Sequence, residues 1–322
     1  DAQESRGLGD VYKRQVYNRA KTIQATFESL KRQTVKDFEW IVINDGSSDD
    51  SEKIIRNFEG GGFPIYYHYQ TNQGKHIAQN HALDVARGEL FLPLDSDDTV
   101  VDDAVETIVN EWNKIKSRLD FAEYSGLGFH CKDETGQIVG TPWPEDHIVS
   151  NDLEMYFIYK VRGEKWGPIR TDIMNEFRSP AIKGKFFSES TVWFQIAQKY
   201  KKAYINKALR LYEIHADSVS TKKTTIQKLF FNVDSYMAAE VIYLNLFYDW
   251  YWKYSRREAI IHPLRLAATA FVNKKPFWCG SEALIKKVKR FFPRLLIAFS
   301  YPVLLVVGWV FIHKARKNRW IQ

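Results

Sequence analysis

The feature that most constrains this fold is a regular alternation of apolar runs and amphipathic segments between residues 16 and 130. The runs 38–44 (FEWIVIN) and 90–94 (LFLPL) predict strands, and the segments 23–30 and 75–86 carry apolar residues at helical spacing. Strands that alternate with helices are typical of a mostly parallel sheet with helices on both faces. The sequence therefore predicts an α/β fold for this part of the chain.

Polar clusters follow three of the predicted strands. They are the segments 16–18 (VYN), 45–49 (DGSSD) and 95–98 (DSDD). In an open α/β sheet, ligands bind outside the carboxyl ends of the strands. Because all three clusters share this placement, we expect a binding site where they meet.

The third cluster has the chemistry of a cation site. Asp95 and Asp97 place two carboxylates one residue apart, and such a pair repels unless a cation neutralises it. Oxygen ligands of this kind suit Mg²⁺ or Mn²⁺, with phosphate oxygens completing the coordination shell. A solvated acidic turn is the alternative interpretation, because acidic turns are common.

Residues 16–98 resemble the family 2 glycosyltransferases of the GT-A fold. The resemblance rests on four motifs in order: VYN at 16–18, INDGSSDDS at 43–51, NQGKHIAQN at 72–80 and GELFLPLDSDD at 88–98. It continues more weakly to Ser218. The resemblance implies a Rossmann-like GT-A domain that binds a nucleotide-sugar donor, most simply a UDP-sugar, together with Mn²⁺ or Mg²⁺.

The resemblance also implies roles for individual residues. Asp45 would accept a hydrogen bond from uracil, Lys75 would contact the base or the diphosphate, and Asp97 would ligate the metal ion. His215, in the segment YEIHADSVS, matches a family histidine near the diphosphate or metal. The other donor-site positions are Tyr17 near the base, Asn18 in its loop, Asp95 at the ribose or metal shell, and Ser96 beside it. Structural alternatives are an Asx turn at Asp45, a solvated helix position at Lys75 and core packing at Tyr17.

The resemblance places the catalytic base at the start of a helix in the stretch 183–200. Glu189 is the matching carboxylate, although a Glu in a first helical turn is also an ordinary dipole partner. Asp172 and Glu176 are fallback candidates for the base. Trp166 is a candidate platform for an acceptor sugar, with core packing as the alternative.

The sequence departs from the family pattern near its start. Residues 1–15 have no apolar period and read as a non-native, adaptor-like segment, and GDVYKRQ stands where the family has its apolar first strand. We nevertheless expect residues 10–16 to run extended beside the strand at 38–44. A second departure is Gln79, which stands where the family often has arginine.

A change to a helical, aromatic-rich pattern divides the chain into a glycosyltransferase-like part, 16–222, and a helical, basic and aromatic part, 223–322. The net charge is +7, but residues 253–322 hold fifteen basic and two acidic residues. The segment 295–312 is 18 residues long without a charge, and basic clusters flank it. We expect it to lie in, or dip into, an anionic membrane at the cytoplasmic face, with a buried core helix as the alternative. A nucleic-acid partner is not expected.

Composition narrows the class of protein further. Two cysteines, Cys131 and Cys279, exclude a disulfide scaffold and a four-cysteine zinc site. The favoured function is inverting, metal-dependent sugar transfer to a saccharide or lipid-linked acceptor in cell-surface polysaccharide or glycolipid synthesis. The alternatives are a catalytically impaired nucleotide-sugar-binding module and a haloacid dehalogenase-like phosphatase with Asp95 as nucleophile.

Overall fold

The computed structural model describes residues 9–182, 187–212, 232–277 and 283–302, with side chains from residue 16 onward except at position 272. The chain divides into two compact units. Unit 1 comprises Asp1–Ala181 and Val192–Ile214, and unit 2 comprises Ile182–Thr191 and His215–Gln322.

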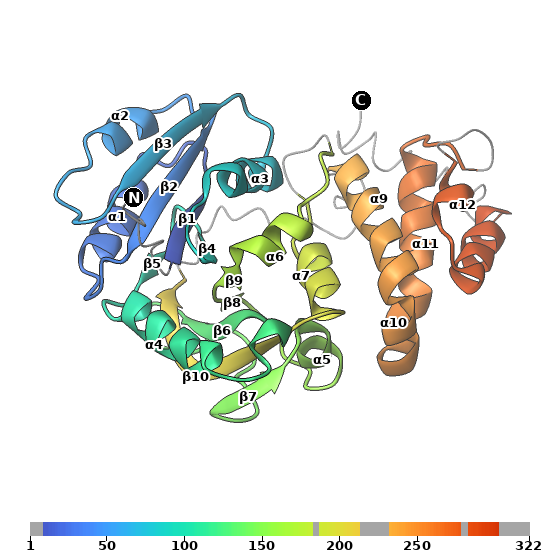
Figure 1. The fold of residues 1–322 in the computed structure, drawn as a ribbon. Coiled ribbons are helices and arrows are strands. Elements are labelled where there is room, and N and C mark those ends of the chain that lie inside the picture. The colour runs from blue at the N-terminus through green and yellow to red at the C-terminus, as the bar shows by residue number, and fades with distance from the viewer. Residues whose placement is uncertain (1–8, 183–186, 213–231, 278–282, 303–322) are drawn as a thin grey trace, which may run out of the picture. The chain divides into compact units, whose positions relative to one another are not determined.

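Unit 1 is built on one 10-stranded sheet whose main path runs β3-β2-β1-β4-β9-β6-β10-β5 (Figure 1). The pairs β3–β2, β2–β1, β1–β4 and β6–β10 are parallel, whereas β9, β5, β7 and β8 join antiparallel. The predicted α/β fold is confirmed, but the sheet is mixed rather than mostly parallel. The strands are β1 (Gly9–Val16), β2 (Phe38–Asp45), β3 (Ile65–Gln70), β4 (Leu90–Leu94), β5 (Thr99–Val100), β6 (Tyr124–Lys132), β7 (His147–Ser150), β8 (Lys165–Trp166), β9 (Ile169–Arg170) and β10 (Lys201–Leu211).

Helices cover both faces of this sheet because alternate residues of its strands point to opposite sides. On β2, Trp40 and Val42 pack in one core cluster with Phe27 of α1, while Ile41 and Ile43 pack in another with helices α3, α6 and α7. The helices of this region are α1 (Ile23–Lys31), α2 (Ser51–Arg56), α3 (Lys75–Val85), α4 (Ala104–Lys116), α5 (Asp152–Phe157), α6 (Thr171–Glu176) and α7 (Ser190–Ala197), with a 3₁₀ turn η1 (Phe121–Glu123). Helix α7 begins in unit 2 and continues into unit 1.

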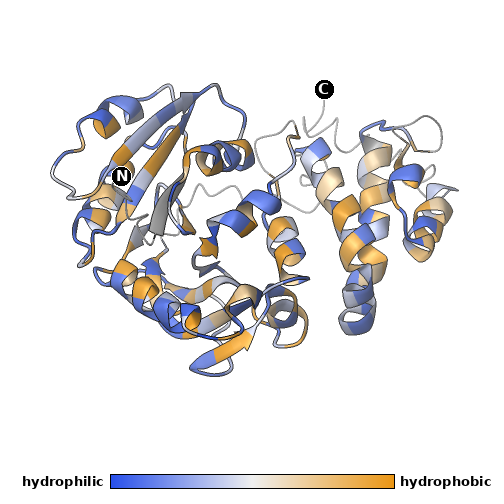
Figure 2. Ribbon diagram, in the orientation of Figure 1, coloured by the Kyte–Doolittle hydropathy of each residue, from blue (hydrophilic) through white to orange (hydrophobic). Residues whose placement is uncertain are grey.

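Unit 2 is helical in its described part. It contains α9 (Val233–Ile242), the π-helical turn η2 (Tyr243–Phe247), α10 (Tyr248–Tyr254), α11 (Arg256–Val272) and α12 (Leu284–Lys287), and residues 291–302 are also helical. A buried pair links two of these helices, since His262 Nδ1 of α11 lies 2.6 Å from Glu240 Oε2 of α9. Figure 2 shows that both hydrophobic and hydrophilic residues occur along these helices.

The predicted membrane segment is only partly covered by the structure. Among the described residues, no helix combines the length and the hydropathy needed to cross a bilayer. The segment 295–312 is described as far as residue 302, where it is helical. Its remaining part lies outside the described residues.

Residues 9–16 form the strand that the sequence analysis expected despite their polar composition. In β1, Gly9–Lys13 pairs with Phe38–Val42 of β2, and Asp10–Lys13 pairs with Phe91–Leu94 of β4. The strand therefore lies inside the parallel half of the sheet, with a hydrogen-bonded neighbour on each side. That position usually holds a continuous apolar run.

We predict that an apolar β1 stabilises the protein. Replacing Gly9–Gln15 with Val and Ile residues ending in Pro should raise the melting temperature by at least about 3 °C, because a central strand favours β-branched apolar residues. Differential scanning calorimetry of both proteins measures this shift. An unchanged melting temperature would show that residues 9–15 do not contribute to the sheet in solution.

Candidate active site

The loops that follow β1 and β2 are hydrogen-bonded to one another. Asn18 has a φ of +53°, in the left-handed region that Asn tolerates better than most residues. Its Oδ1 accepts from the backbone N–H of Ser48 at 2.9 Å, and its own N–H donates to Ser47 Oγ at 3.1 Å. The N–H of Ala20 donates to Asp49 Oδ2 at 3.0 Å. The two loops thus form one rim, on which Tyr17 is partly exposed.

Asp45, at the end of β2, is fully buried and accepts hydrogen bonds from the end of β3 and the turn before α3. Its carboxylate receives the side-chain amide of Gln70 at 2.7 Å and the backbone N–H groups of Gln73 and Gly74 at 2.8 and 2.9 Å. Gly74 precedes α3 with a φ of +96°, a conformation that favours glycine. Asp45 therefore fixes the turn into α3, and its recognition of a uracil ring remains a prediction.

The structure brings the acidic loop after β4 beside two cations from other strand ends. Lys75, the first residue of α3, places Nζ 3.4 Å from Asp95 Oδ1. Arg19 places Nη2 3.6 Å from Asp97 Oδ2. Both carboxylates are about one quarter exposed, with side-chain values of 26% for Asp95 and 25% for Asp97. A polar, solvent-accessible site with both signs of charge results, and Arg19 is a member that the sequence analysis missed.

The backbone of this acidic loop is anchored from α1. The hydroxyl of Thr22 donates to the carbonyl oxygen of Ser96 at 2.8 Å, and that of Thr26 donates to the carbonyl of Asp98 at 2.9 Å. Ser96 itself is buried. Its backbone therefore has a structural role, while its predicted contact with the donor is untested.

A buried ion pair with a residue of β10 holds the same loop in place. Arg210 of β10 is 3% exposed, and its Nη1 lies 3.3 Å from Asp98 Oδ2, while its Nη2 lies 3.2 Å from Glu164 Oε2. Burial raises the pKa of the Asp98 carboxyl to about 7, against the opposing pull of the Arg210 charge. We regard this contact as an ion pair rather than an aligned hydrogen bond, because Asp98 Oδ2 has no hydrogen-bond donor in the described part of the chain.

Gln79 lies one helical turn beyond Lys75 on α3, where the family often has arginine. Its side chain is 2% exposed, and its Oε1 finds no hydrogen-bond partner within the described residues. A neutral, buried amide brings no positive charge to an anionic ligand. At this end of the sheet, positive charge on the exposed side of the acidic loop comes from Lys75 and Arg19 instead.

Asp95 and Asp97 are the side chains with which unit 1 could hold a divalent ion. Within the described ranges, no group of three or more His, Cys, Asp or Glu side chains is arranged as a metal site. A hard cation commonly takes one or two carboxylates from the protein and further oxygens from substrate phosphates and water. The pair fits that pattern, and His215 lies outside the described residues.

Glu189 directly precedes α7 and is partly exposed. It belongs to unit 2, whereas Asp95 and Asp97 belong to unit 1. Within unit 2 the Tyr243 hydroxyl lies 3.0 Å from Ser188 Oγ and 2.8 Å from Ser190 Oγ, so hydrogen bonds hold the chain on both sides of Glu189. Its role as catalytic base remains a prediction.

The fallback candidates for the base are paired with cations in unit 1. Arg170 donates to both oxygens of Asp172, and Lys199 donates to Glu176. Trp166 is 6% exposed and its indole N–H donates to the carbonyl of Pro93 in β4, which favours core packing over an acceptor platform. Asp172 and Glu176 are therefore members of exposed ion pairs, whereas Trp166 has a structural role in the core.

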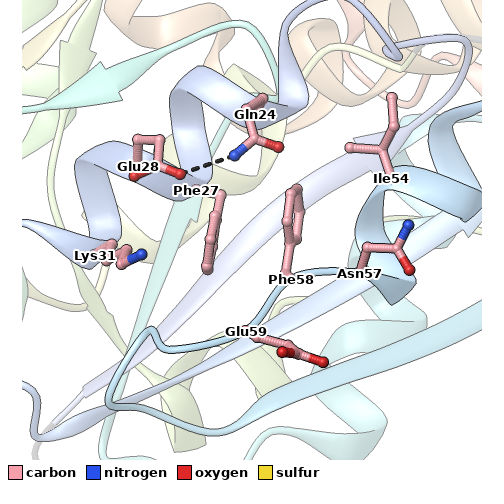
Figure 3. Close-up of a pocket in the computed structure, with 8 residues that line it drawn as sticks. All are labelled: Gln24, Phe27, Glu28, Lys31, Ile54, Asn57, Phe58 and Glu59. Atoms are coloured by element: carbon pink, nitrogen blue, oxygen red, sulfur yellow. Dashed lines mark hydrogen bonds between the residues drawn. The ribbon is translucent and has the colours of Figure 1, made fainter.

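A shallow hollow on the other side of α1 contains none of these residues. It lies between α1 and the end of α2, where Phe27 stacks on Phe58 with ring centroids 4.2 Å apart (Figure 3). Its lining is Gln24, Phe27, Glu28, Lys31, Ile54, Asn57, Phe58 and Glu59. The hollow holds the carboxylates of Glu28 and Glu59 and the ammonium group of Lys31, but none of the residues that the sequence assigns to the donor site.

Residues 15–121 match the family model described as Glycosyl transferase family 2. Among curated proteins, the GalNAc(5)-diNAcBac-PP-undecaprenol beta-1,3-glucosyltransferase of Campylobacter jejuni is 28% identical over 213 residues. The match covers 63% of this chain and 64% of that enzyme, so this chain spans somewhat less than two thirds of its relative's length.

Solved structures share the fold of this chain. TarS 1–349 of S. aureus in complex with UDP-GlcNAc superposes with a TM-score of 0.59 at 17% identity, covering 94% of this chain and 87% of that one. The mannosyltransferase PcManGT of Pyrobaculum calidifontis, solved with GDP-Man and Mn²⁺, gives a TM-score of 0.55 at 16% identity, covering 98% of this chain and 88% of that one. The likeness to both structures shows a GT-A-like fold.

We predict that Arg210 is essential for stability. Arg210→Met should destabilise the protein by about 3–5 kcal/mol, because it leaves Asp98 buried without its counter-ion. Urea unfolding measures the loss. Arg118→Met is the matched control, since Arg118 pairs with Asp120 on the exposed surface and should unfold like the wild type. Equal unfolding of both variants would contradict the anchoring role of Arg210.

Proposed function

Residues 15–121 match the model of glycosyl transferase family 2, and from that premise we propose that this chain transfers a sugar from a UDP-sugar with inversion at the anomeric carbon. The observation that carries the proposal is the meeting of Lys75 and Arg19 with Asp95 and Asp97 at the carboxyl ends of the parallel strands. This is where a doubly wound α/β sheet binds its ligand. The complex of TarS with UDP-GlcNAc supports the choice of nucleotide.

On the donor side, the diphosphate is the group that leaves with negative charge. Lys75 and Arg19 provide cationic side chains that bind and orient it, and such preorganised charge lowers the barrier in proportion to the charge that develops. Mn²⁺ or Mg²⁺ held by Asp97, with Asp95 beside it, supplies further positive charge there when bound. Asn18 positions the loop that carries Arg19 through its bonds to Ser47 and Ser48.

On the acceptor side, Glu189 is the proposed general base. It removes the proton from an acceptor hydroxyl as that oxygen forms a bond to the anomeric carbon. The bond between the anomeric carbon and the diphosphate oxygen breaks, and its electron pair leaves with the nucleoside diphosphate. One feature of unit 2 supports this role. The hydroxyls of Ser188, Tyr243 and Ser190 are hydrogen-bonded to one another, which holds the chain on both sides of Glu189.

The proposed class of acceptor is based on the Campylobacter jejuni relative and not on a pocket of this structure. The name of that enzyme includes a glycan that is linked to undecaprenol through PP. We propose a saccharide or lipid-linked acceptor in bacterial surface glycan synthesis, used at the cytoplasmic face of the membrane. We favour this function over the phosphatase alternative, because the cluster at 95–98 follows β4 within the region that matches the family 2 model and within a fold shared with the mannosyltransferase PcManGT.

A donor panel tests the proposed function directly. The purified chain is incubated with UDP-, GDP- and dTDP-sugars in the presence of Mn²⁺, and released nucleoside diphosphate is measured. Release from a UDP-sugar, increased by a saccharide acceptor, is the expected result. UDP binding without turnover of any donor would favour the non-catalytic binding module instead.

Asp97→Asn should abolish metal-dependent turnover while leaving the fold intact. A neutral amide cannot replace the charge that holds a hard cation, so the apparent affinity for Mn²⁺ should fall together with activity. Mn²⁺ titrations followed by electron paramagnetic resonance measure binding without substrate. Asp102→Asn is the control, because Asp102 pairs with Arg32 on the surface. Full activity of Asp97→Asn in Mn²⁺ would contradict the assignment of Asp97 as a metal ligand.

Glu189→Gln should lower the rate by about two to four orders of magnitude, the usual contribution of a general base. UDP affinity, measured by calorimetry, should stay within a factor of about two, because the base contacts the acceptor. Glu176→Gln is the matched control and should keep its activity. A collapse of UDP affinity in Glu189→Gln would identify Glu189 as a donor-binding or structural residue.

A further inference from the structure

The helix at 291–302 in unit 2 has one packed side and one exposed aromatic side. On the packed side Ile297 is fully buried, and the ring of Tyr301 lies 4.8 Å from that of Phe277 and 6.0 Å from that of Phe271. On the other side, Phe291 is 73% exposed and Phe299 is 74% exposed. Eight residues are about 2.2 helical turns, so these two rings lie roughly 80° apart around the helix axis and both point away from Ile297.

A second helix extends this exposed side. Phe292 is 42% exposed, and its ring centroid lies 5.0 Å from that of Trp252 on α10, which is also 42% exposed. We call Trp252, Phe291, Phe292 and Phe299 the aromatic face. Single exposed aromatic residues are ordinary, but a group of four on adjacent helices of one unit is typical of an interaction surface.

Positive charge surrounds the aromatic face. The guanidinium of Arg256 lies 6.0 Å from the ring centroid of Trp252. The segment 286–294 holds five basic residues and no acidic one, and Lys286, Lys289 and Arg294 are exposed. The nearby acidic residue Asp249 is paired with Arg290 at 2.9 Å. The surface therefore combines exposed aromatic rings with a positive rim.

We propose that the aromatic face inserts into the interfacial layer of an anionic bilayer. Aromatic rings favour the boundary between headgroups and acyl chains, and Lys and Arg beside them bind acidic headgroups within a Debye length of the surface. The charge complementarity of the rim favours an acidic lipid over a neutral one. This proposal concerns unit 2 alone and does not rest on the chemistry assigned to unit 1.

Sedimentation with vesicles tests the proposal on the full chain. The wild type should bind vesicles containing phosphatidylglycerol and bind pure phosphatidylcholine much more weakly. Phe291→Ser should weaken binding by about tenfold, because it removes one exposed ring that the bilayer would bury. Phe291→Trp should retain binding, since Trp also favours the interface.

Controls separate membrane insertion from folding and from simple charge attraction. Leu119→Ser alters an exposed apolar residue of unit 1 and should bind vesicles like the wild type. Lys286→Gln with Lys289→Gln should weaken binding to anionic vesicles and reduce its dependence on salt. Thermal melting shows whether each variant is folded.

Three results would overturn the proposal. They are unchanged vesicle binding by Phe291→Ser, equal loss in Phe291→Ser and Phe291→Trp, and equal binding of the wild type to neutral and anionic vesicles. Binding of a single-stranded RNA that depends on Phe291 and excludes vesicles would assign the aromatic face to nucleic acid instead.

Discussion

The buried charge of Arg210 is the constraint on which the site of unit 1 depends. A guanidinium that is 3% exposed must find counter-charges inside the protein, and it finds them in Asp98 and Glu164. Because an unpaired buried charge costs several kcal/mol, the acidic loop cannot move away from β10 without a large loss of stability. Strand β10 follows that loop by about a hundred residues, so the fold of the whole unit fixes the loop.

The same pairing explains why three neighbouring aspartates have different properties. Asp98 points into the protein, where burial raises its pKa to about 7 and Arg210 compensates its charge. Asp95 and Asp97 are about one quarter exposed and face Lys75 and Arg19. One residue of the DSDD cluster thus anchors the loop, and two remain accessible to a cation or a diphosphate. The residue types alone do not reveal this division, because all three side chains are identical.

Short-range patterns predicted the part of the fold in which strands and helices alternate. The runs at 38–44 and 90–94 are β2 and β4, and the polar clusters after them lie at one end of the sheet. The antiparallel part escaped prediction because β5, β8 and β9 have two residues each and show no period. Arg210 was missed since its partners, Glu164 and Asp98, lie 46 and 112 positions away. The burial of Asp45 was not predicted, because a polar loop residue gives no sign of its exposure, and the structural alternative named for it was an Asx turn.

Strand β1 occupies a central position in the sheet although its sequence lacks the apolar run that usually marks such a strand. Its sequence is polar, yet its backbone pairs with β2 and β4 over consecutive residues. The register shifts between Lys13 and Val16, and Val16 is fully buried and pairs with Asn44. After this point the loop is held by Asn18 and Ala20 through bonds to the loop after β2. The position of Arg19 at the site therefore depends on contacts from Val16 onward, while the backbone of Gly9–Lys13 pairs with β2 and that of Asp10–Lys13 pairs with β4.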